Sequence, residues 1–116
     1  MRYVCLAQGA YFALTGVWPL VSLRSFEAIT GPKVDAWLVK TVGVLVGVVG
    51  AVLLLSGVRG DAPVEVIVLG AGSALALAGI DAWYVGRRVI PPIYLLDAAL
   101  ELTLVIAWGI TWLARR

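Results

Sequence analysis

The distribution of apolar positions divides the chain into four long segments joined by short polar links. The segments cover residues 3–23, 36–57, 64–85 and 92–114, and each is apolar almost throughout. About 20 helical residues cross a hydrocarbon layer of about 30 Å, whereas a membrane strand would alternate in character over about 10 residues. The pattern therefore predicts an all-α, polytopic integral membrane protein with four transmembrane helices in an up-down-up-down antiparallel bundle.

The polar links are too short to contain a further domain. The longest one, residues 24–35, is expected to be a loop, so residues 1–116 are predicted to form a single four-helix transmembrane domain. The dipeptides Gly31-Pro32 and Pro91-Pro92 mark helix boundaries, because proline suits the first turn of a helix and breaks its interior. An even number of spans places both termini on one membrane face, side A, and the 24–35 link on the other, side B.

Composition supports the membrane prediction and narrows the possible partners. The chain is 62% hydrophobic and 14% charged, whereas about a quarter of the residues in soluble domains are charged. The lipid bilayer is therefore the first predicted partner, and a net charge of +2 is too small to indicate nucleic-acid binding. With no histidine and one cysteine, no metal site or cofactor is predicted. Abundant Ala, Gly, Val and Arg without Asn is typical of GC-rich bacterial genomes and favours a bacterial inner membrane.

Small residues on the predicted helices indicate close helix packing. Gly43 and Gly47 form a GxxxG pair, which lets two backbones approach closely and predicts self-association or a membrane-protein partner. Basic residues are nearly balanced between the two faces, so they do not set the orientation. Four short spans and balanced charge resemble the small multidrug-resistance transporters. Those proteins carry their essential glutamate in the first span, where this chain has Gln8, so the resemblance stops at size and charge.

Charged side chains inside the apolar segments are the strongest candidates for chemistry. Lys40, Asp81 and Asp97 are predicted at similar depth below side B, and Glu101 lies about one helical turn (~5 Å) deeper. An ionised side chain at the centre of a bilayer costs about 2.5–3.5 kcal/mol on insertion scales, so such groups are candidate functional sites. Asp97, Glu101 and Trp108 share one face of the last segment, although Trp108 is also expected to mark the interface at side A.

Two interpretations of this cluster remain open. In one, Lys40 forms an ion pair with Asp81 or Asp97 that holds the helices together. Glu101 is then protonated or hydrogen-bonded to Thr15 or a tyrosine. In the other, Glu101 takes up and releases a proton beside Lys40 as a fixed counter-charge. A second, weaker group of candidates lies in the links on side B, where basic residues could contact lipid headgroups. Its members are Arg24, Lys33, Asp35, Arg87 and Arg88.

Three functions follow from these patterns. The favoured one is a proton- or cation-coupled transporter or channel-like protein that uses the carboxylate cluster. The alternative is a non-catalytic scaffold or accessory subunit, whose charges only hold the bundle together. A lipid-active enzyme ranks last, because no Ser, His or Cys nucleophile arrangement is present in the sequence.

Overall fold

The protein is all-α. The structure is a computed structural model that describes residues 2–30, 36–60 and 62–115. Its helices are α1 (Arg2–Val21), α2 (Leu23–Thr30), α3 (Ala36–Arg59), α4 (Val64–Gly86) and α5 (Tyr94–Arg115). Helices α1, α3, α4 and α5 are long and apolar enough to cross a membrane. These four helices confirm the four predicted segments, and predicted and observed ends differ by two residues or fewer.

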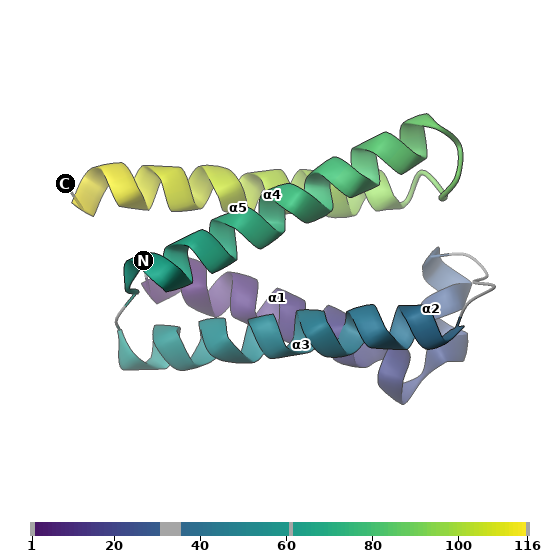
Figure 1. Cartoon of the computed structure of the whole chain (residues 1–116), viewed down its shortest axis with the longest axis horizontal. Coiled ribbons are helices and arrows are strands. Elements are labelled where there is room, and N and C mark those ends of the chain that lie inside the picture. Colours follow the sequence, from purple (N-terminus) through teal and green to yellow (C-terminus); the bar gives the residue numbers. More distant parts are fainter. Residues whose placement is uncertain (1, 31–35, 61, 116) are drawn as a thin grey trace.

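The long helices are arranged as two pairs. Figure 1 shows α1 beside α3 and α4 beside α5, with the start of α1 and the end of α5 at the same end of the molecule. Packing is extensive within each pair and sparse between the pairs. Figure 1 also shows α4 running obliquely away from α3 after the short turn that joins them. We call α1 with α3 the first hairpin and α4 with α5 the second hairpin.

Glycines allow the backbones of α1 and α3 to touch. A Cβ atom at Gly43 would lie 2.5 Å from the carbonyl oxygen of Gly16, and one at Gly50 would lie 2.5 Å from the backbone nitrogen of Ala13. Both distances are far shorter than any real Cβ contact, so only glycine fits at these positions. By contrast, a Cβ at Gly47 would meet nothing within 4 Å. The predicted GxxxG pair therefore acts within one chain, and its two glycines are not equivalent.

The predicted loop 24–35 is partly helical, since residues 24–30 belong to α2. The helical hydrogen bonding continues through the break after α1, because Ser22 N–H donates to the Trp18 carbonyl and Phe26 N–H donates to that of Ser22. The Trp18 ring meets Phe26 edge to face at 5.2 Å, and its Nε1–H donates to Ser25 Oγ. These side-chain contacts fold α2 back onto α1 and explain why a polar segment is ordered. The second half of the predicted loop, 31–35, lies outside the described residues.

The unequal environments of the two glycines on α3 lead to a test of the first hairpin. Gly43→Ala should lower the free energy of unfolding by about 1–3 kcal/mol, because the added methyl group must push α1 away from α3. Gly47→Ala is the matched control and should be neutral or stabilising by about 0.5–1 kcal/mol, because alanine favours the helix over glycine. Unfolding of both variants in detergent measures the difference. Equal effects of the two substitutions would contradict the packing described above.

Candidate functional site

A buried amide forms hydrogen bonds between the two hairpins. Gln8 on α1 is fully buried and its Nε2 donates to the Gly70 carbonyl of α4 at 2.8 Å. Its Oε1 accepts a hydrogen bond from Trp108 Nε1 of α5 at 2.6 Å. Gln8 Nε2 also lies 3.4 Å from Ser73 Oγ on α4. Because packing between the hairpins is otherwise sparse, these hydrogen bonds define how α1 sits against α4 and α5.

Gly70 is required where the Trp108 ring crosses α4. A Cβ at Gly70 would lie 2.6 Å from Cζ2 of the indole, so a larger residue would displace the ring. Trp108 is only 1% exposed and belongs to the apolar core with Cys5, Leu53 and Ile67. The expectation that Trp108 marks the membrane interface is therefore wrong. Its indole N–H has a buried partner, as a buried tryptophan generally requires.

Further along the same helices, three carboxyl groups gather on the inner faces of α4 and α5. Glu101 is fully buried, and neither carboxyl oxygen has a hydrogen-bond partner among the described residues. Asp81 of α4 is 6% exposed, and its Oδ2 also lacks a partner there. Asp97 is half-buried and interacts directly with Asp81, and both acids are close enough to act electrostatically on Glu101. We call Asp81, Asp97 and Glu101 the carboxyl cluster.

The first hairpin contributes one polar group to the carboxyl cluster. The Tyr11 hydroxyl of α1 donates a hydrogen bond to Asp97 Oδ1. Thr15, an expected partner of Glu101, instead donates to the backbone carbonyl of Tyr11 within its own helix. The tyrosine expected as a partner for Glu101 therefore bonds to Asp97, and the deepest carboxyl group has neither predicted donor.

Lys40 does not pair with the carboxyl cluster. Its side chain is exposed at the start of α3, and no ion pair joins it to an acid in the described part of the chain. The expected ion pair between Lys40 and Asp81 or Asp97 is therefore not formed. Helix α3 packs mainly on α1 and meets the second hairpin, which carries the acids, only sparsely. The spacing of residues in the sequence predicts how deep a residue lies in the membrane. It does not predict which helix packs beside the one that carries the residue.

The basic residues of the side-B links are spread over separate elements. Arg24 is exposed on α2, while Arg87 and Arg88 are exposed at the α4–α5 turn. The Arg87 guanidinium lies 5.7 Å from the centroid of the Trp83 ring, a cation–π contact. Lys33 and Asp35 lie outside the described residues. The predicted headgroup contacts of this group stay a prediction.

The chemistry open to the carboxyl cluster is limited by what surrounds it. Within residues 2–30, 36–60 and 62–115, no three acidic or sulfur side chains are grouped in a way that could hold a metal ion. Buried carboxyl groups that lie this close together can instead share and exchange protons. The chain matches no protein-family model, no curated protein and no solved structure.

Sequence reasoning did not assign Gln8, Tyr11 or Trp108 to the site. Tyr11 and Thr15 lie one turn and two turns after Gln8 on α1, so a polar stripe was visible in the first segment. Trp108 shares a helical face with Asp97 and Glu101, which also indicated an inward position. The signal was ambiguous for Trp108, because tryptophan near a helix end is equally typical of a membrane interface.

The junction between the hairpins can be tested by a double-mutant cycle. Gln8→Leu and Trp108→Phe should each destabilise the protein, because each leaves a buried polar group without its partner, a cost of about 1–3 kcal/mol. The two effects should be coupled by about 0.5–3 kcal/mol, since both substitutions remove the same hydrogen bond. Gln8→Leu combined with Trp112→Phe, at an exposed tryptophan on the same helix, is the control and should be additive. Additivity in both cycles would contradict the bond between Gln8 and Trp108.

Proposed function

We propose that the protein is an integral membrane protein that binds a proton or small cation at the carboxyl cluster and couples this binding to transport. Helices α1, α3, α4 and α5 would cross the bilayer in alternating directions, with both termini on one side. The observation that carries the proposal is Glu101, a fully buried carboxyl group with no hydrogen-bond partner among the described residues. It lies beside two further acids and has no lysine or arginine paired with it in the described part of the chain.

The electrostatics of the carboxyl cluster favour an exchangeable positive charge. Three neighbouring carboxylates cannot all stay ionised in apolar surroundings, because each costs several kcal/mol to bury and all repel one another. A bound proton or monovalent cation removes most of this cost. If Lys40 neutralised the cluster permanently, no exchange would be needed, but Lys40 is exposed and unpaired with it. The carboxyl cluster is therefore suited to take up and release its counter-charge.

Access to Glu101 supports a one-sided binding site. Asp97 lies one helical turn before Glu101, on the side of the α4–α5 link. It is half-buried and accepts a hydrogen bond from the Tyr11 hydroxyl. On the other side of Glu101 lie the buried groups Gln8 and Trp108. In this proposal the ion enters past Asp97 and Tyr11, and the Gln8–Trp108 hydrogen bond closes the way to the opposite face. The sparse packing between hairpins would let the second hairpin move relative to the first during transport.

A transport path through four helices alone would be narrow. The buried interior is filled by side chains such as Trp108 and Phe12, and many large apolar side chains lie on the outer faces of the helices. We therefore propose that transport takes place in a homo-oligomer or with a membrane-protein partner, in which outer helix faces contribute to the path.

A scaffold or accessory subunit is the second candidate. The hydrogen bonds of Gln8 support it, because they hold the hairpins together through well-partnered groups that need no ligand. In that case Glu101 would stay protonated and serve only as a buried polar group. Under this function the wild-type protein would not conduct protons, and substitutions in the carboxyl cluster would change assembly or stability alone.

Proton flux into liposomes containing the purified protein distinguishes the two functions. Glu101→Gln should reduce flux at least tenfold, because the amide keeps the shape of the side chain and cannot exchange a proton. Glu65→Gln, at an exposed acid in the first turn of α4, is the matched control and should leave flux unchanged. Flux of the Glu101→Gln protein equal to that of wild type would refute the transport proposal. Wild-type flux no higher than that of empty liposomes would favour the scaffold.

A further inference from the structure

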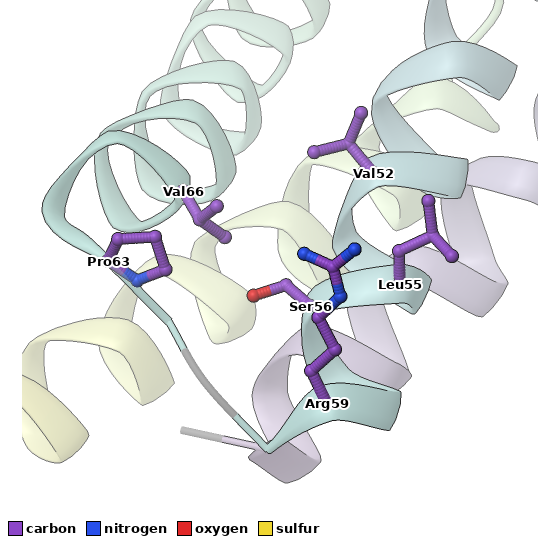
Figure 2. A pocket seen from close by; sticks show the side chains of 6 residues that line it. All are labelled: Val52, Leu55, Ser56, Arg59, Pro63 and Val66. Atoms are coloured by element: carbon purple, nitrogen blue, oxygen red, sulfur yellow. The ribbon is translucent and has the colours of Figure 1, made fainter.

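A small cavity lies at the turn between α3 and α4, away from the carboxyl cluster. It encloses about 190 Å³ and is lined by Val52, Leu55, Ser56, Arg59, Pro63 and Val66. Figure 2 shows the Arg59 guanidinium turned back along α3 toward the space between that helix and Val66. Asp81 lies near the opposite end of α4, so this cavity is separate from the proposed ion site.

The cavity carries one charged side chain, that of Arg59. Arg59 is exposed in the last turn of α3, and among the described residues no carboxylate forms an ion pair with it. The other lining side chains are apolar except for the Ser56 hydroxyl. An arginine above an apolar groove suits a ligand with a phosphate group at one end and a hydrocarbon chain at the other. The planar guanidinium can hold two phosphate oxygens at once.

An apolar stripe leads away from Arg59 along α3. Val48, Val52 and Leu55 precede Arg59 at spacings of four, three and four residues, so all four lie on one face of the helix. The three apolar side chains are 56%, 38% and 61% exposed. Val52 and Leu55 of this stripe also line the cavity, so the stripe continues the cavity along α3. In a bilayer such a cavity must be filled, because an empty gap forfeits van der Waals contacts with the side chains around it.

We propose that this groove binds one anionic phospholipid, with its phosphate on Arg59 and an acyl chain along Val48, Val52 and Leu55. The inference rests on the membrane placement proposed above but not on ion binding by the carboxyl cluster. A zwitterionic lipid is bound less tightly, because its own cationic group competes with Arg59 for the phosphate. The lipid fills the cavity between α3 and the start of α4, at the end of α4 opposite the ion site.

Lipid retention measured by native mass spectrometry tests this site. Purified protein in detergent is titrated with phosphatidylglycerol or phosphatidylcholine, and the bound fraction is counted. One phosphatidylglycerol should bind in preference to phosphatidylcholine, and Arg59→Gln should weaken that binding about tenfold through loss of one charge-assisted contact. Arg2→Gln, at an exposed arginine at the start of α1, is the matched control and should bind as wild type does.

Two further arms separate the alternatives. Val52→Trp fills the apolar part of the groove and should weaken both lipids, whereas glycerol 1-phosphate, which has no acyl chain, should not bind detectably. Equal weakening by Arg59→Gln and Arg2→Gln would overturn the proposal, because it would show diffuse charge attraction. A change of oligomeric state on Arg59→Gln would also overturn it and assign the groove to a second copy. Glu101→Gln should bind lipid as wild type does. A failure of the ion-transport proposal would therefore leave the result of the lipid-binding test unchanged.

Discussion

The Gln8 amide is the interaction on which the arrangement of the helices depends. Each hairpin is internally well packed. In the first hairpin, glycines let the backbones of α1 and α3 touch, and in the second, α4 and α5 pack along each other. Between them the contact is sparse, and Gln8 bonds both to the Gly70 carbonyl and to the Trp108 indole. In an apolar environment these polar groups have no water to replace a lost partner, so their pairing is specific even where little surface is buried.

The carboxyl cluster has the opposite character to this junction. Both side-chain polar atoms of Gln8 have hydrogen-bond partners, while neither carboxyl oxygen of Glu101 has one within the described part of the chain. A protein that buries a carboxyl group without a donor or cation retains an electrostatic cost, and such a cost is a general feature of sites that exchange a charge. The two polar layers are neighbours on α5, since Glu101 and Trp108 lie two turns apart on one face. Movement of one hairpin against the other would therefore change both together.

The proposed ion site and the proposed lipid site lie at opposite ends of α4. The first lies where the hairpins share the Tyr11–Asp97 hydrogen bond, and the second lies where α3 and α4 diverge around Arg59. A lipid in the cavity would add contacts to α3 and α4 at Val66, which also packs against the apolar core. The two proposals thus describe one physical situation, in which weak packing between hairpins permits motion and bound groups complete the interface.

The sequence by itself determined the four long apolar helices, their ends to within two residues, and the inward position of Asp81 and Glu101, because helix length and periodicity are local properties. It did not reveal α2, whose order depends on Trp18 meeting Phe26 and Ser25. It also led to the wrong partner for Lys40 and the wrong environment for Trp108. Only the tertiary structure decided these points, since it selects which helix faces meet. Spacing along a chain fixes depth and face within one helix, whereas the pairing of α1 with α3 removed Lys40 from the acids and brought Gln8 to Trp108.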